Sequence, residues 1–235
     1  MTALVLRLAA PLQSWGTSSR FTRRGTDRQP SRSGVIGLLA AAQGRRRTDS
    51  IEDLMELRIG VRADQPGLVE REFQTARTRD GSAAMPLSER YYLADAVFAA
   101  AIEAPPALLE GLREALRRPV FPLFLGRRSC PPAGKLDHGL HEGSLDEVLT
   151  RLPWLASRAV QQACKTAVTP LMVTRDCAPD TPGSQVVHDD PLTFDHRHRQ
   201  YGWRSVVQHR VEVPNPTWVP PVDTHDPMDL LGEPV

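Results

Sequence analysis

The order of apolar patterns along the first half of the chain is the feature that most constrains its fold. Short runs rich in Leu, Val and Ala predict buried strands, and longer runs with apolar side chains at helical spacing predict helices. In chain order these are a strand at 3–10, a helix at 34–42, strands at 57–63 and 96–104, a helix at 107–118 and a short strand at 121–125. This order favours an α+β chain whose residues 1–125 form a ferredoxin-like domain of the RNA-recognition-motif type.

A long insertion interrupts this order between the second and third strands. Two extended runs within residues 68–95 flank the turn signal Asp80-Gly81, and arginines recur along them. A turn dipeptide between two extended runs is typical of a β-hairpin. The sequence therefore predicts a protruding hairpin at about 68–95.

The remainder of the chain carries weaker patterns, and we expect residues 126–213 to form a β-rich extension. The extension is predicted to contain a helix at 145–155 and strands at 168–173 and 201–213, with an irregular polar segment at 176–198. Residues 214–235 are proline-rich and acidic, so little structure is expected in that tail.

Composition excludes several classes of protein. The chain has 235 residues, 40% of them hydrophobic, and no apolar run long enough for a membrane span or a signal peptide. Its three widely spaced cysteines argue against a disulfide framework and favour the reducing cytoplasm. His196 and His198, with Asp195 beside them, have the spacing of a metal pair or an acid/base site, but this spacing is common by chance and the sequence specifies no further ligand, so neither a metal nor another cofactor is expected.

Positive charge is concentrated at one end of the chain. Nine arginines and a single acid, Asp27, lie between Arg7 and Arg47, whereas the whole chain has a net charge of only +1. Such a cluster repels itself unless a polyanion neutralises it, and a phosphate backbone is the obvious polyanion. An arginine-rich composition spread over solvated faces is the alternative, but it does not explain the clustering.

Three short motifs follow predicted strands or open a helix. In the first, Gln13 and Ser14 can hydrogen-bond phosphate or sugar and Gly16 permits unusual backbone geometry, while Trp15 either stacks on a base or anchors the loop in the core. In the second, Arg32 and Ser33 open a helix whose N-terminus would attract a phosphate, or Ser33 is an ordinary cap.

The third motif is a loop of mixed glycine, arginine and proline that follows the predicted strand at 121–125. Arg127 and Arg128 are adjacent and are followed by Ser129 and Cys130. Two arginines beside a glycine and a serine make an anion-binding loop plausible. No Gly-rich nucleotide loop, nucleophile elbow or paired-carboxylate signature accompanies the three motifs.

Taken together and in this order, the three motifs resemble the CasD family, the backbone subunits of the type I-E CRISPR surveillance complex called Cascade. Phe73-Gln74-Thr75 and the return strand starting at Arg90 fit the same family. The resemblance is specific over about residues 3–130, loose between 135 and 200, and absent after about 213.

The resemblance implies a non-catalytic subunit that grips the 5′ handle of the CRISPR RNA and displaces a base with a thumb hairpin. It implies CasC filament subunits and the large CasA subunit as partners, with target DNA reached indirectly through the complex. The residues it assigns to RNA binding are Gln13, Ser14, Trp15, Gly16, Arg20, Arg23, Arg24, Arg28, Arg32, Ser33, Gln74, Arg77, Arg127, Arg128, Ser129 and Cys130.

Two other functions stay open. A relative in type I-C systems cuts RNA, so the chain is alternatively a metal-independent endoribonuclease that would draw on Tyr91, Tyr92, His138 or His141. However, no Lys–His pair lies near the three motifs. The third reading is a protein-only adaptor with a solvated arginine face.

Overall fold

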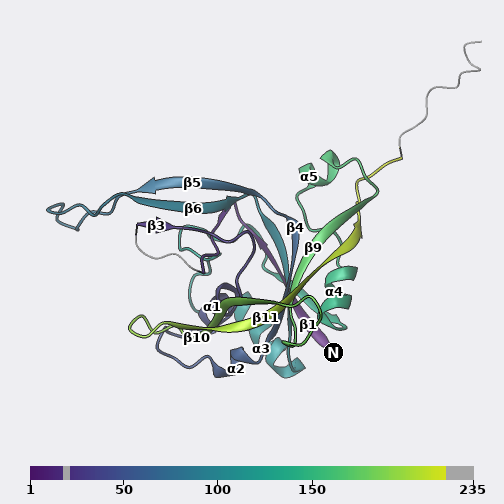
Figure 1. The fold of residues 1–235 in the computed structure, drawn as a ribbon, viewed down its shortest axis with the longest axis horizontal. Coiled ribbons are helices and arrows are strands. Elements are labelled where there is room, and N and C mark those ends of the chain that lie inside the picture. Colours follow the sequence, from purple (N-terminus) through teal and green to yellow (C-terminus); the bar gives the residue numbers. More distant parts are fainter. Residues whose placement is uncertain (18–21, 221–235) are drawn as a thin grey trace, which may run out of the picture.

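A seven-stranded antiparallel sheet forms the centre of the molecule (Figure 1), which is a computed structural model describing residues 1–17 and 22–220. The strand order is β10-β11-β9-β4-β7-β1-β8, and every neighbouring pair is antiparallel. The strands are β1 Thr2–Ala9, β4 Arg58–Gln65, β7 Val97–Glu103, β8 Asp137–Glu142, β9 Val168–Asp176, β10 Gln185–Thr193 and β11 Gln200–Pro214.

Two helices cover one face of the sheet. Helix α1 (Arg32–Ala42) lies between β1 and β4 in the chain, and α3 (Pro106–Arg117) lies between β7 and β8, as the apolar spacing predicts. Alternate leucines of β1 pack against apolar side chains from both helices in one buried cluster. A one-turn helix, α2 (Glu52–Met55), links α1 to β4. The first three predicted strands are confirmed.

The prediction of a strand at 121–125 is wrong. The strand that follows α3 and joins the sheet is β8 instead. Pro122 lacks an N–H for a ladder, and Phe121 donates its N–H to a carbonyl at the end of α1 rather than to a strand. Strand β8 escaped prediction because it is short and polar and contains Gly139 at φ +98.

The opposite face of the sheet is also covered. Small side chains of β1 and β7 make room there for helix α4 (Leu145–Arg151) and the segment that follows it. Arg62 and Asp64 form a fully buried ion pair, and the Trp154 indole N–H donates to the Asp64 carbonyl at 2.7 Å. Bases therefore cannot stack on this face as they do on the open sheet of an RNA-recognition motif.

The boundaries of the extension differ from those predicted. Helix α4 ends at Arg151 rather than at 155, because Leu152 precedes Pro153 and adopts an extended conformation. A short helix, α5 (Arg158–Ala163), follows. The prediction of an irregular segment at 176–198 is wrong for the residues of β10. Register shifts interrupt the pairing of β10 with β11, so the sequence of β10 shows no clear strand periodicity. Most of the predicted tail lies outside the described residues.

Two hairpins extend from the same side of the molecule (Figure 1). One pairs β5 (Leu68–Gln74) with β6 (Ser88–Ala94), and β6 also pairs with the short strands β2 (Leu12–Gln13) and β3 (Arg23–Arg24). The other is the β10–β11 hairpin. None of the helices in the described part of the chain is long and apolar enough to cross a membrane.

Candidate functional site

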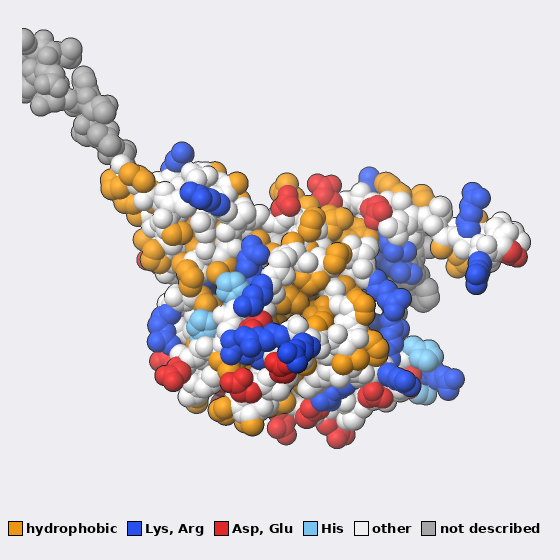
Figure 2. Space-filling view, turned by 180° about the vertical axis from the view of Figure 1, so that it is seen from behind, with side chains coloured by type: hydrophobic (Ala, Val, Ile, Leu, Met, Phe, Trp, Pro, Cys, Tyr) orange, Lys and Arg blue, Asp and Glu red, His pale blue; other side chains and the backbone are white. Residues whose placement is uncertain are grey.

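All three sequence motifs contribute to one groove, a hollow of about 250 Å³ beside helix α1. Its other walls are the loop before residue 126 and the tip of the β10–β11 hairpin. Its lining includes four arginines and no carboxylate among the described residues. The lining residues are Ser14, Trp15, Gly16, Ser31, Ser33, Gly34, Gly37, Leu38, Ala40, Ala41, Arg45, Arg46, Arg47, Phe124, Gly126, Phe194 and Arg199. Figure 2 shows Lys and Arg side chains gathered between the two hairpins.

The first motif builds the floor of the groove with buried side chains. The Gln13 amide nitrogen donates to the carbonyls of Leu8 and Ala96, and its oxygen accepts the Trp15 indole N–H at 3.1 Å. Trp15 is 1% exposed, and a Cβ on Gly34 would lie 2.7 Å from its ring. Of the two interpretations of Trp15, its burial supports the one in which the side chain anchors the loop in the core. The Gln13 side chain holds the same loop through its hydrogen bonds.

Close backbone packing joins the first motif to the third. Gly126 has φ +83, and a Cβ there would lie 1.6 Å from the Ser14 carbonyl oxygen, so only glycine fits. The Ser14 N–H donates to the Leu125 carbonyl at 3.2 Å. Gly16 does not have a positive φ, and a Cβ there would make a tight contact of 3.1 Å with the Gly25 carbonyl oxygen.

The second motif opens α1, but Ser33 is not the cap. Ser31 is the N-cap, and its hydroxyl accepts the Gly34 N–H. The Arg32 N–H donates to the Asp189 carboxylate at 2.7 Å, so a carboxylate from the chain itself already occupies the place expected for a phosphate. Ser33 lies beside Ser31, with the two hydroxyls 3.3 Å apart.

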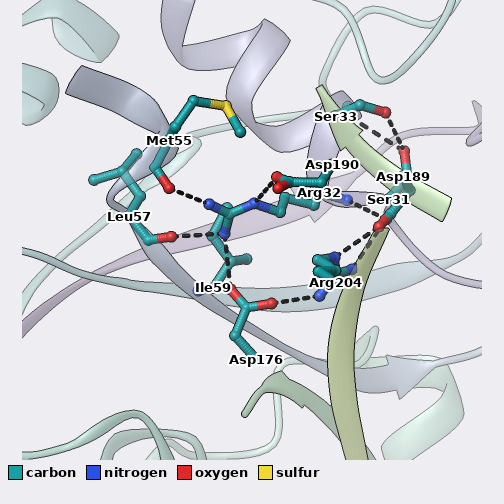
Figure 3. Close-up of polar contacts among 11 residues, drawn as sticks. Ser31, Arg32, Ser33, Met55, Leu57, Ile59, Asp176, Asp189, Asp190 and Arg204 are labelled. Atoms are coloured by element: carbon teal, nitrogen blue, oxygen red, sulfur yellow. Dashed lines mark hydrogen bonds and ion pairs between the residues drawn. The ribbon is translucent and has the colours of Figure 1, made fainter. Parts of the chain in front are cut away.

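The Arg32 side chain faces away from the groove into a buried ionic network (Figure 3). It is 6% exposed and binds the carboxylates of Asp176 at 2.8 Å and Asp190 at 2.6 Å. Its other two hydrogen bonds go to the carbonyls of Leu57 and Met55, both at 2.6 Å. With four of its five N–H groups occupied, this guanidinium is a structural group rather than a phosphate ligand.

Arg204 of β11 completes this network. It forms two hydrogen bonds with Asp189 and one with Asp176, and it is 16% exposed. Asp176 also accepts the Ile59 N–H. We call Arg32, Arg204, Asp176, Asp189 and Asp190 the hub. The hub joins α1, β9, β10 and β11, and it thereby fixes the β10–β11 hairpin as one wall of the groove (Figure 3).

A second cationic cluster lies at the base of the β5–β6 hairpin. The Arg127 guanidinium lies 4.6 Å from the centre of the Tyr92 ring and donates to the carbonyls of Arg24 and Gly25. Within the described part of the chain, Arg127 Nη1 and Arg90 Nε are buried donors without a hydrogen-bond acceptor. A buried donor without an acceptor is costly, so this cluster is suited to an added anionic ligand.

The remaining predicted residues are scattered around these two features. Arg24, Arg28, Arg128 and Ser129 are exposed, and Arg23 lies 5.5 Å from the centre of the Tyr91 ring. Gln74 donates to Glu72, and Arg77 bridges to Ala84 farther out on the β5–β6 hairpin. Cys130 is buried, and burial raises the pKa of its thiol, so it presents no thiolate. Arg20 lies outside the described residues.

Some groove residues escaped the sequence analysis. Arg46 and Arg47 are exposed and line the groove, whereas Arg45 is held by Asp53 in a two-pronged ion pair. All three belong to the N-terminal charge cluster, but nothing in their spacing distinguishes arginines that line a groove from solvated ones. Phe194 and Arg199 carried no signal, because a strand that packs against α1 was not predicted there.

Comparisons with known proteins agree with one another. The family described as CRISPR-associated protein (Cas_Cas5) matches residues 3–207. The CRISPR system Cascade subunit CasD of Escherichia coli (strain K12) is 35% identical over 161 residues, which cover 60% of this chain and 70% of that protein. A chain of a solved CRISPR RNA-guided surveillance complex is 33% identical with a TM-score of 0.76, covering 94% of this chain and 95% of its own. A crystal structure of a Cas protein is 35% identical with a TM-score of 0.68, covering 91% and 95%.

Proposed function

The chain belongs to the CRISPR-associated Cas5 family, and on that premise we propose that it is the subunit of a Cascade surveillance complex that binds the 5′ handle of the CRISPR RNA. The groove beside α1 is the observation that carries the proposal. Three motif loops meet there, four arginines line it, and none of its described lining residues is acidic. A concave surface of one sign of charge attracts a phosphate backbone.

Different arginines have different roles in this proposal. Arg46, Arg47 and Arg199 are the phosphate-binding side chains of the groove, where Ser33 adds a hydroxyl. Arg127 and Arg90 bind a phosphate at the base of the β5–β6 hairpin, where their unsatisfied donors lie, and the exposed Arg128 extends this positive surface. Arg32 acts indirectly, by holding the hairpin wall.

The fold supports a finer assignment. The order β8-β1-β7-β4, with α1 and α3 on one face, is the order of a ferredoxin-like domain, to which we assign residues 1–125 together with β8. We assign the β5–β6 hairpin as the thumb and the remaining C-terminal strands as the extension. In the assembled complex the subunit caps the filament of CasC subunits and contacts CasA, and target DNA is reached through the complex in the cytoplasm.

We infer a binding role rather than catalysis. The side chains that a nuclease would draw on lie on two different sheets: Tyr91 and Tyr92 on β6, and His138 and His141 on β8. Tyr92 is buried under Arg127, and burial together with Arg7 lowers the pKa of His138. Incubating the protein with repeat RNA in EDTA tests this inference, and a discrete cleaved product would refute it.

The proposed function predicts salt-sensitive binding of handle RNA. Fluorescence anisotropy with a labelled handle RNA, measured across a range of salt concentrations, should show a log–log slope of about −0.7 per phosphate contacted. Combining Arg127→Ala with Arg128→Ala should weaken binding and prevent assembly of the coexpressed complex. Arg58→Ala is the matched control, because Arg58 is 51% exposed and pairs with Glu103 on the sheet. Affinity that does not change with salt would contradict the proposal.

A further inference from the structure

The outer face of the β10–β11 hairpin carries an exposed aromatic pair that the groove does not use. Trp203 is 68% exposed, although tryptophan is among the side chains that gain most from burial. The His188 ring lies over it, with ring centres 4.5 Å apart and planes tilted by 30°. The His188 Nε2 also contacts the Tyr201 carbonyl at 3.0 Å, which fixes the position of the imidazole.

Ring and cation contacts connect this pair to the groove. The His188 and Tyr201 rings lie 6.2 Å apart, edge to face. The Arg199 guanidinium lies 5.2 Å from the Tyr201 ring centre and 5.8 Å from that of Phe194. Because Phe194 and Arg199 line the groove, the contacts continue from the groove onto the outer face of the hairpin. We call Phe194, Arg199, Tyr201, His188 and Trp203 the ladder.

Strand alternation holds the ladder in place. On β11 successive side chains point to opposite faces, so Trp203 points outward where Arg204 points into the hub. On β10 the register shift between Val187 and Asp190 lets Asp189 and Asp190 both reach the hub, while His188 lies against Trp203. The hub residues are hydrogen-bonded to one another, and Arg32 and Asp189 are buried, so the hub fixes the backbone that carries His188 and Trp203. A fixed row of rings loses little conformational entropy when a ligand binds.

We propose that the ladder is a base-stacking platform for single-stranded RNA that continues out of the groove. The inference rests on the proposed function, because it extends the same RNA strand. Planar rings interleaved with a guanidinium are the chemistry of sequence-tolerant single-strand binding. The ladder contains no carboxylate, and Arg197 adds a further cation at the hairpin tip. Tryptophan, tyrosine and arginine are also common at protein interfaces, so the continuity of the ladder with the arginine-lined groove is the observation that favours RNA.

Tryptophan fluorescence tests the platform directly in the full-length protein. Trp15 and Trp154 are buried, and the half-buried Trp218 follows the end of β11 that is remote from the hairpin, so Trp203 should dominate quenching by a single-stranded oligoribonucleotide of about 12 nucleotides. Trp203→Ala should remove most of the quenching and weaken binding by about 5- to 150-fold, the equivalent of one lost base stack. Trp203→Phe keeps a ring and should retain most of the affinity. Leu192→Ala is the control, since Leu192 is 54% exposed on the same hairpin but outside the ladder.

A groove variant separates this inference from the function on which it rests. If Arg46→Ala with Arg47→Ala weakens binding while Trp203→Ala leaves affinity unchanged, the platform is refuted and the proposed function stands. If the unmodified protein does not bind the oligoribonucleotide, the proposed function fails and the platform fails with it. If Trp203→Ala binds RNA normally but no longer joins the coexpressed complex, the face docks a protein and the platform is refuted. Loss of both quenching and affinity in Trp203→Ala alone supports it.

Discussion

Replacing Arg32 with methionine should destabilise the protein without removing an RNA contact. The methionine keeps most of the apolar stem but leaves Asp190 without its cationic partner and removes one of the two arginines that bind Asp176. Breaking a buried ion pair by removing one partner costs about 3–5 kcal/mol. Because Asp176 and Asp190 are 15% and 20% exposed, we expect the lower half of that range. For a chain of this length such a loss lowers Tm by about 6–16 °C.

Two measurements separate a structural role from an RNA contact. Urea unfolding gives the loss of stability, and the salt dependence of RNA binding, measured well below the lowered Tm, gives the number of phosphate contacts. An arginine that touches a phosphate of single-stranded RNA contributes about 0.7 to the log–log slope. Arg32→Met should therefore leave the slope unchanged while lowering affinity through a displaced hairpin wall. Asp190→Asn, a milder change in the same hub, should lower stability and affinity by less and should also leave the slope unchanged.

Either of two results would refute this reasoning. A Tm within about 1 °C of that of the unmodified protein would mean that the network contributes nothing, since isolated exposed pairs are worth at most about 1 kcal/mol. A slope reduced by about 0.7 would mean that Arg32 reaches a phosphate in the complex. Arg58→Ala provides the reference for an exposed pair, because its guanidinium is 51% exposed.

Three further changes test the groove and the loops around it. Gly126→Ala should cost clearly more stability than Gly81→Ala in urea unfolding, because both positions have positive φ, worth about 1–2 kcal/mol, but only the first also meets a carbonyl oxygen. Arg46→Ala with Arg47→Ala should reduce the salt slope of RNA binding by about 1.4, and an unchanged slope would remove both from the phosphate contacts. Burial, and then the charge of Asp189, raise the pKa of Asp27, so ionisation of this carboxyl opposes folding. Asp27→Asn should therefore be more stable than the unmodified protein above about pH 4, and equally stable in stronger acid. A gain only in acid would reverse that sign.

The helices and strands of the N-terminal half were predictable because their apolar patterns are local and strong. The apolar runs of β1 and β7, the alternation in β4 and the leucines of α3 at helical spacing locate their elements within a few residues. Strand β10 was not predictable from the sequence. Its pairing with β11 contains register shifts, and its residues Asp189 and Asp190 bind Arg32, which lies more than 100 residues away in the chain. Polarity suggested a loop there. In the folded chain that polarity pairs with Arg32, a partner that no local pattern reveals.

The site was predictable as a meeting of loops, but the roles of individual side chains were not. Gln13 and Trp15 have the chemistry to hydrogen-bond sugar and to stack on a base, yet both satisfy the core instead. A sequence shows which groups a loop carries, whereas burial decides which of them a ligand can reach. Arg46 and Arg47 show the converse, because ordinary-looking arginines after a helix line the groove once the β10–β11 hairpin closes over α1.

Burial also explains why the N-terminal arginine cluster does not need a single ligand. Its charge is divided among an internal network around Arg32, an exposed pair between Arg45 and Asp53, and open side chains such as Arg46 and Arg47. The hub contains three aspartates and two arginines, so it carries no positive charge of its own to offer to RNA. Only the open side chains need a polyanion to neutralise them, and they are fewer than the nine arginines of the cluster. Arg46 and Arg47 line the groove, and the hub fixes the hairpin that forms one of its walls. The network that buries Arg32 therefore also shapes the groove in which Arg46 and Arg47 would bind RNA.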